Sequence, residues 1–132
     1  GEDYITAPIS VYDEQGKSIS TKVLQGIQDT IRTVYQRDFE RCLEEQMDVE
    51  ETRFLRSKFS VNFKINTEGK VSDIELVEIW VKKQDAKGTN LGDVDAKGMS
   101  ACVVERLSGW EFDPPPEVDY FHTHAGQVGE AF

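Results

Sequence analysis

The residues best suited to chemistry in this sequence are two histidines that lie close together near its end. His122 and His124 flank Thr123, so an extended strand would place both imidazoles on one face, where they could hold a metal ion. No carboxylate or cysteine is clearly placed as a third ligand. We therefore interpret them as surface histidines and expect no metal site. If they titrate near pH 6–7, partner binding beside them would respond to acidity.

Two cysteines, Cys42 and Cys102, form the second candidate group. An even number permits either one disulfide or two buried thiols, and both interpretations stay open at this point. Neither cysteine belongs to a Cys-x-x-Cys pair and the chain has two histidines, which argues against a four-ligand zinc site. No histidine is near either cysteine in sequence, so a catalytic thiol is disfavoured.

No familiar catalytic or cation-binding motif occurs in the sequence. Gly-x-Ser-x-Gly, a Walker loop and His-Glu-x-x-His are all missing. The segment that starts at Asp93 resembles the beginning of a calcium loop, but Lys97 and Val104 stand where ligands are required. Paired acids such as Glu44 and Glu45 are typical of a solvated helix face. We expect no enzyme activity, no cofactor and no catalytic residue.

Charge and length narrow the classes of partner. The chain has 132 residues, with 15 Lys and Arg against 25 Asp and Glu, for a net charge of −10. A nucleic acid is an improbable partner, because phosphate binding needs a surplus of cations. Anionic membrane surfaces are disfavoured for the same reason. No apolar stretch is long enough to cross a bilayer, so we expect no direct membrane insertion by this domain.

Two helices position the cysteines. Ser20 is a reasonable N-cap, and apolar residues recur every three or four positions from Leu24 to Cys42, which predicts a helix to about Met47. Similar spacing predicts a second helix over residues 97–109. The intervening polar stretch at 82–98 is expected to be a loop.

Three strands complete the predicted elements. Phe59 to Ile65 alternates, a turn follows at 66–69, and the return strand runs to about Trp80. On that strand we expect Ile74 and Leu76 to face the core. The last strand covers 118–124. One of its faces carries Val118, Tyr120, His122 and His124 and the other carries Phe121, and which of them faces the core stays open.

These elements predict an α+β fold in the order α-β-β-α-β, with two helices packed on one face of a three-stranded antiparallel sheet. Residues 1–19 are expected to form an N-terminal arm or an extra hairpin. Residues 20–124 form the domain, and residues 125–132 are expected to be a flexible tail.

Three stretches resemble a known family. They are IRTVYQRDFERCLEE (31–45), FSVNFKINTEGKVS (59–72) and CVVERLSGWEF (102–112), the last leading into three prolines. Together they resemble TonB-like C-terminal domains, and most closely the subgroup at the ends of bacterial gliding-motility proteins. The likeness covers roughly residues 20–124.

The resemblance implies a non-enzymatic protein-binding module in the periplasm, tethered to the inner membrane by the rest of its chain. Such domains transduce energy or force from an inner-membrane motor complex to periplasmic or outer-membrane proteins, in transport or gliding motility. The family's helix-to-helix disulfide maps onto Cys42 and Cys102. Its partner peptides add as an extra strand along the third strand. The corresponding residues here are Val118, Asp119, Tyr120, Phe121, His122, Thr123 and His124.

An alternative stays open beside strand addition. The same edge could pair with the chain's own N-terminal hairpin, or it could stay unused. It could also pair with a second copy of the chain, as a homodimer, which would make this a structural assembly domain of a cell-envelope motility or transport complex.

Overall fold

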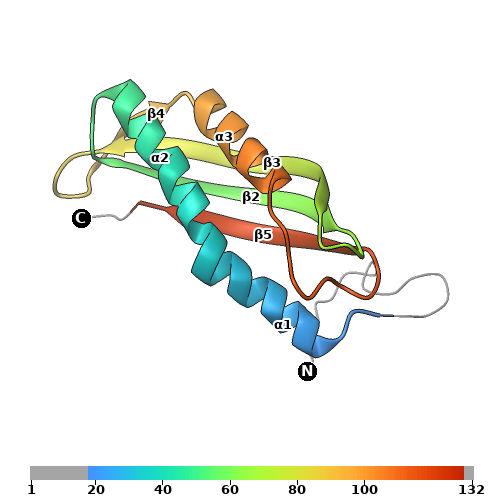
Figure 1. Cartoon of the computed structure of the whole chain (residues 1–132). Coiled ribbons are helices and arrows are strands. Elements are labelled where there is room, and N and C mark those ends of the chain that lie inside the picture. Colours follow the sequence, from blue (N-terminus) through green and yellow to red (C-terminus); the bar gives the residue numbers. More distant parts are fainter. Residues whose placement is uncertain (1–17, 130–132) are drawn as a thin grey trace.

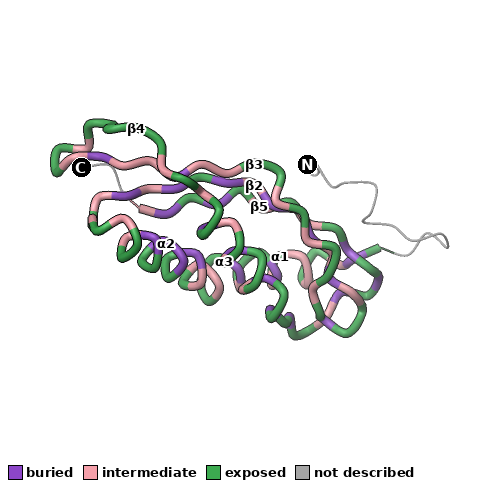
Figure 2. Tube along the Cα trace, turned by 90° about the horizontal axis from the view of Figure 1, so that it is seen from above, coloured by how far each residue is buried: buried purple, intermediate pink, exposed green. Residues whose placement is uncertain are grey.

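Helices cover one face of an antiparallel sheet in residues 18–129, the part of the chain that the computed structural model describes (Figure 1). Seen from above, the helices form one layer and the strands the other, and none of the helices in residues 18–129 lies on the opposite face of the sheet (Figure 2). The elements in chain order are α1 (Thr21–Thr30), a π-helical turn (Ile31–Tyr35), α2 (Gln36–Glu50), β2 (Leu55–Ile65), β3 (Val71–Gln84), β4 (Asn90–Val94), α3 (Lys97–Ser108) and β5 (Tyr120–Val128).

The first helix, which the spacing of apolar residues predicted, is confirmed. The Ser20 hydroxyl accepts a 3.2 Å hydrogen bond from the Val23 amide, as an N-cap should. The helical stretch ends when Glu51 adopts a left-handed φ of 55°. Helical residues therefore run from 21 to 50, slightly beyond the predicted end.

The sheet has four strands, which corrects the expected three. Their order is β4-β3-β2-β5, and all neighbours are antiparallel. The additional strand, β4, lies within the stretch expected to be a loop, and β3 itself continues into that stretch as far as Gln84. Strand β4 is short and almost entirely exposed, so it lacks the alternation of apolar residues that identifies a half-buried strand.

The predicted hairpin between β2 and β3 is confirmed at its turn. The Asn66 side chain accepts hydrogen bonds from the amides of Glu68 and Lys70, and Gly69 has a φ of 81°. The Phe112 amide donates to the carbonyl of Gly69 at 3.0 Å. This bond joins the tip of the hairpin to the segment that follows α3.

The C-terminal boundary of the domain lies beyond its predicted position. Strand β5 continues to Val128, so residues 125–128 belong to the sheet and not to a flexible tail. The predicted N-terminal arm or hairpin lies almost wholly outside the described residues, since the description begins at residue 18. Ile19 is buried in the core cluster.

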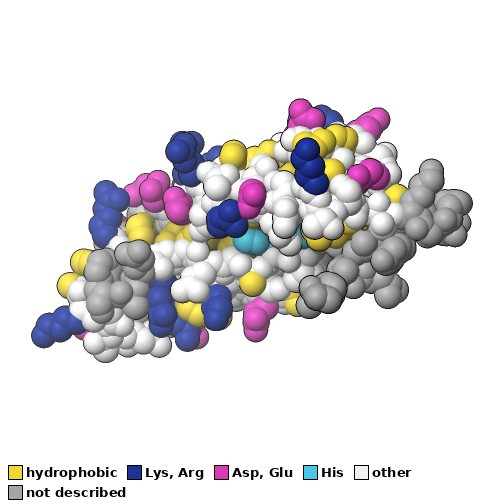
Figure 3. Space-filling model, turned by 90° about the horizontal axis from the view of Figure 1, so that it is seen from below, with side chains coloured by type: hydrophobic (Ala, Val, Ile, Leu, Met, Phe, Trp, Pro, Cys, Tyr) yellow, Lys and Arg dark blue, Asp and Glu magenta, His cyan; other side chains and the backbone are white. Residues whose placement is uncertain are grey.

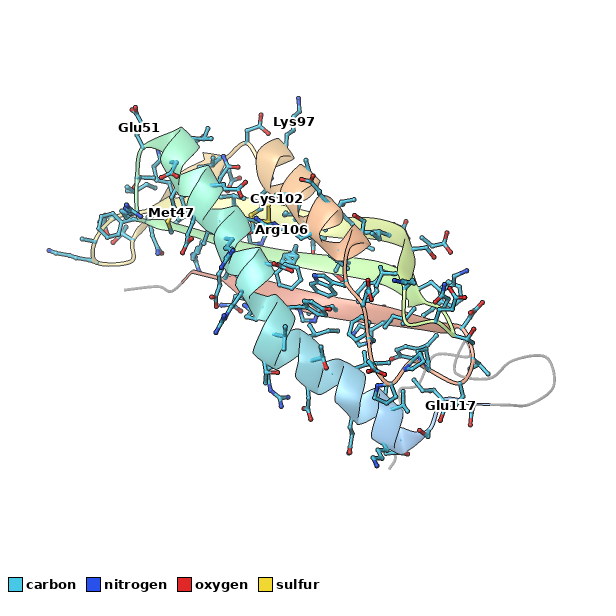
Figure 4. The ribbon with its side chains drawn as sticks, viewed as in Figure 1. Met47, Glu51, Lys97, Cys102, Arg106 and Glu117 are labelled. Atoms are coloured by element: carbon cyan, nitrogen blue, oxygen red, sulfur yellow. A yellow bond between two sulfur atoms is a disulfide. The ribbon has the colours of Figure 1, made fainter. Side chains whose placement is uncertain are left out.

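Cys42 and Cys102 are joined by a disulfide that links α2 to α3, as Figure 4 shows. Both cysteines lie on the sides of these helices that face each other, where the predicted apolar stripes placed them. Of the two interpretations that the sequence left open, the disulfide is the correct one.

Candidate functional site

The candidate site is the outer edge of β5. This strand pairs with β2 over nine residue pairs, from Ile65–Tyr120 to Ser57–Val128, with no break in register. Within residues 18–129 no strand lies on its other side. Figure 3 looks at this edge: the helices form the upper part of the view, the open face of the sheet lies below, and histidine side chains are visible between them.

The first two predicted site residues precede the strand. Val118 is buried, whereas Asp119 is exposed and its Oδ2 lies 4.0 Å from the Nζ of Lys64 on β2. Lys64 Nζ also lies 3.4 Å from Asp73 Oδ2 on β3. The beginning of β5 is therefore held to the sheet by charge as well as by backbone pairing.

The other five predicted residues divide between the two faces of β5. Tyr120, His122 and His124 face the helices, while Phe121 and Thr123 lie on the open face. Phe121 keeps 46% of its surface exposed, although it is a large apolar residue at the edge of the sheet. The structure thus places five of the seven predicted residues on β5 and the other two directly before it, and their side chains have different surroundings.

The two histidines are not the surface groups that we expected. The ring of His124 stacks on Phe39 of α2, with centroids 5.4 Å apart and an interplanar angle of 18°. His122 lies 5.4 Å from the ring of Phe63, and its Nδ1 shares a 3.0 Å hydrogen bond with the Tyr120 hydroxyl. These contacts make the histidines part of the aromatic layer between helices and sheet.

Burial changes the protonation of this face. Loss of hydration, helped by repulsion from His124, lowers the pKa of His122 to about 4. Burial also lowers the pKa of His124 and raises the pKa of Tyr120 to about 12. His122 is therefore neutral at pH 6–7, and titration of this histidine in that range is not expected. Within residues 18–129, no three His, Cys, Asp or Glu side chains gather as metal ligands.

The aromatic layer holds the site in place. Tyr35 stacks on Trp110 with centroids 4.3 Å apart, and its hydroxyl donates a 2.6 Å hydrogen bond to the Glu111 carbonyl. The Trp110 indole N–H donates to Asp38 Oδ2 at 2.8 Å. Arg106, which Figure 4 shows on α3 close to the disulfide, lies 3.6 Å from Asp38. These contacts fix α2 and the end of α3 above the sheet.

Two contacts important to the edge were missed from the sequence. The ring of Phe59 on β2 covers the backbone of Gly126 on β5, its partner in the register. Gln36, at the start of α2, donates from Nε2 to the Gln127 carbonyl at 3.2 Å. The alternation of inward and outward positions continues through Ala125, Gly126 and Gln127 to Val128, and it could have indicated the longer strand. Gly126 and Gln127 obscure this alternation in the sequence.

A shallow hollow lies elsewhere on the molecule, between α3 and β3. Its volume is about 800 Å³, and Leu76, Ala96, Ala101 and Val104 are among its lining residues. The groups whose pKa burial shifts strongly, His122 and Tyr120, lie at β5 and not in this hollow. The hollow therefore offers mainly apolar surface.

Comparisons with known proteins add one similarity. No family model matches the chain, and no curated protein matches it. One solved structure is similar, the NMR solution structure of the Helicobacter pylori TonB C-terminal domain, residues 179–285. The identity is 16%, the TM-score is 0.36, and the match covers 85% of this chain and 86% of that one. Among the described residues, no helix has both the length and the apolar character that a bilayer span requires.

Proposed function

We propose that this chain is a non-enzymatic protein-binding module that takes an extended segment of a partner as an additional strand along the outer edge of β5. The observation that carries the proposal is the edge itself. Strand β5 is nine residues long and in continuous register with β2, and its outer side is unpaired within residues 18–129. An extended peptide satisfies such backbone groups, and side chains at alternate positions supply selectivity.

The other edges of the sheet are less suited to strand addition. Strand β4 has five residues and contains Gly92, whose φ is 120°. Beyond the reach of β4, strand β3 is interrupted by two register shifts opposite β2, and Asp73 there has a φ of 53°. Bulges of this kind protect an edge against pairing. The regular geometry of β5 therefore favours it as the edge that receives a partner.

The direction of the free backbone groups follows from one contact. In an antiparallel pair, successive residues point their backbone groups alternately toward the partner strand and away from it. Gln36 reaches the Gln127 carbonyl from α2, so we infer that odd-numbered residues point outward. The amides and carbonyls of Phe121, Thr123 and Ala125 would then be available to an incoming strand. Phe121, half exposed beside them, offers it apolar area.

The cellular setting is part of the proposal. A disulfide between α2 and α3 suits an oxidising compartment, and the TonB-like sequence pattern is typical of a periplasmic domain tethered to the inner membrane. We propose this location, with a periplasmic or outer-membrane protein as partner and an inner-membrane motor complex acting through the parent chain. The alternative, a dimerisation domain of a motility or transport assembly, uses the same edge.

The test begins with peptides selected from a displayed random library on the purified chain. Hydrogen exchange then maps the bound peptide. We expect new protection at the amides of residues 121, 123 and 125, because these would pair with the added strand. Protection confined to the helices or to the open face of the sheet would contradict the proposal.

Two substitutions at one position separate backbone from side-chain effects. Thr123→Pro removes an outward amide without removing a bond to β2, so we expect peptide binding to be lost. Thr123→Val keeps the amide and loses the 2.7 Å hydrogen bond from Thr123 Oγ1 to Asn62, so binding should persist. Sedimentation at micromolar concentration tests the alternative: a dimer that Thr123→Pro dissociates would establish self-pairing instead.

A further inference from the structure

The open face of the sheet carries a cluster of cations around one tryptophan. Trp80 on β3 lies opposite Lys58 in the register, and Lys82 lies opposite Arg56. The four side chains share the face that carries no helix, because their neighbours Leu55, Ser57, Phe59 and Val81 are buried on the other face. We call Arg56, Lys58, Trp80 and Lys82 the cationic patch. Figure 3 shows Lys and Arg side chains gathered at the lower left, on this side of the sheet.

The cations of the patch are close together and form no ion pair among the described residues. Lys82 Nζ lies 4.8 Å from the centre of the Trp80 ring, and the Arg56 guanidinium lies 5.4 Å from it. Within residues 18–129, no carboxylate lies within 4.0 Å of the charged nitrogens of Arg56, Lys58 or Lys82. Arg56 Nε is buried and has no acceptor among the described residues.

This arrangement runs against the charge of the whole chain. Acids outnumber bases by ten, yet among the described residues only Arg32, Lys64, Lys70 and Arg106 lie in ion pairs, and what sets the patch apart is that three cations gather around one ring. Three unpaired cations around one indole repel each other, and an added negative charge would relieve that repulsion. The nearest acids in the register are Glu78, opposite Ser60, and Asp93, opposite Lys82, and both are exposed at the border of the patch.

We infer that the cationic patch is a second interaction surface, separate from the β5 edge, and that it binds an extended acidic segment of a protein. Arg56 and Lys58 are two residues apart on one strand face, a spacing of about 6.7 Å. Carboxylates at alternate positions of an extended chain have the same spacing. An acidic segment lying along β2 can therefore place alternate carboxylates on Arg56 and Lys58, and Lys82, opposite Arg56 on β3, lies beside the first of them.

Two other kinds of ligand fit this surface less well. A carbohydrate ring would stack on a free indole face, but cations already lie over the Trp80 ring. An anionic bilayer would meet a chain whose net charge is −10, and most of its surface would be repelled. A short acidic segment contacts the patch without bringing a large anionic surface near the rest of the molecule.

The test uses a synthetic peptide of alternating glutamate and threonine, with a glutamine version as the uncharged control. In the spectrum of the ¹⁵N-labelled chain, we expect the Trp80 indole signal to move on titration with the glutamate peptide. The Trp110 signal should stay in place, because that residue is 2% exposed. Binding should weaken as salt rises, and the glutamine peptide should not bind.

Charge reversal at matched positions locates the site. We expect Lys58→Glu with Lys82→Glu to reduce affinity by about tenfold or more. Lys22→Glu with Lys97→Glu changes the net charge equally, at exposed positions on α1 and α3, and should leave affinity within about twofold. A melting curve for each variant confirms that it is folded, and Lys58→Gln with Lys82→Gln, which adds no repulsion, should give an intermediate loss.

Several results would overturn the inference. Equal losses in the two charge-reversed variants would show a general charge effect, and a stationary Trp80 signal would place binding elsewhere. Binding to phosphatidylglycerol vesicles or to a sulfated glycan, without binding to the glutamate peptide, would assign the patch to a different ligand. Thr123→Pro should leave peptide binding at the patch intact, so failure of the β5 proposal can be recognised separately.

Discussion

The ring of Phe59 on β2 lies directly over the backbone of Gly126 on β5, and the two residues are partners in the strand register. A Cβ atom at position 126 would overlap the ring. Phe59 also packs edge-to-face on Phe39 of α2, with centroids 4.8 Å apart. One aromatic side chain thus joins the helix layer to the strand that carries the candidate site.

Gly126→Ala should therefore destabilise the fold by about 1–3 kcal/mol, because an added methyl group forces the Phe59 ring from its position. Urea denaturation measures the difference. The matched control is Gly26→Ala in α1, where nothing lies within 4 Å of the new methyl group and helix propensity should raise stability by up to about 1 kcal/mol. Equal stabilities for Gly126→Ala and the unmodified chain would show that the ring is not confined there.

The disulfide should contribute strongly to stability. Cys42 and Cys102 are 60 residues apart, and closing a loop of that length is worth about 4 kcal/mol in the chain-entropy model. We expect the double variant Cys42→Ser with Cys102→Ser to melt well below the unmodified chain. Addition of a reductant to the unmodified chain should reproduce most of that loss. If the melting temperature is the same with and without reductant, the cross-link has no stabilising role.

The free energy of unfolding should decrease as pH falls, because His122 resists protonation in the folded chain. Its pKa is about 4 in the folded chain and about 6.5 when unfolded, so the unfolded state takes up the proton first as pH falls. The stabilisation is complete above about pH 6.5 and is lost as pH falls toward 4. We expect a loss of about 2 kcal/mol over that interval, allowing for the partial exposure of the ring.

Denaturation at several pH values between 7 and 4 checks this expectation. His122→Asn removes the titrating group, so the variant should show a smaller decline over the same interval. Part of the decline should remain in this variant, because His124 also has a lowered pKa. Parallel declines for His122→Asn and the unmodified chain would assign the pH dependence to other groups.

Asp38 should stabilise the fold by accepting the hydrogen bond from the Trp110 indole. Asp38→Ala leaves the buried indole N–H without its acceptor and should cost about 1–3 kcal/mol of stability. Asp38→Asn keeps an acceptor oxygen and loses only the charge facing Arg106, so its effect should be smaller. Glu40→Ala, at an exposed position on the same helix, serves as the control. Thermal melts of the three variants give the comparison, and equal losses for Ala and Asn would assign the effect to charge.

Local sequence patterns determined the helices and the first hairpin of this protein. The apolar spacing from Leu24 to Cys42 can be satisfied only by a helix with one buried stripe, and Asn66 and Gly69 specify their turn through bonds to neighbouring residues. These features depend on residues a few positions apart. For that reason they could be predicted without knowledge of the fold.

Tertiary structure decided the features that join distant residues. It chose a disulfide over two separate thiols, turned His122 and His124 toward the helices, and extended β5 by covering Gly126 with Phe59. It also added β4, which is held to the sheet by pairing with β3 and not by an apolar pattern of its own. Each of these outcomes depends on which side chains meet across the packed layers, and no short stretch of sequence records that.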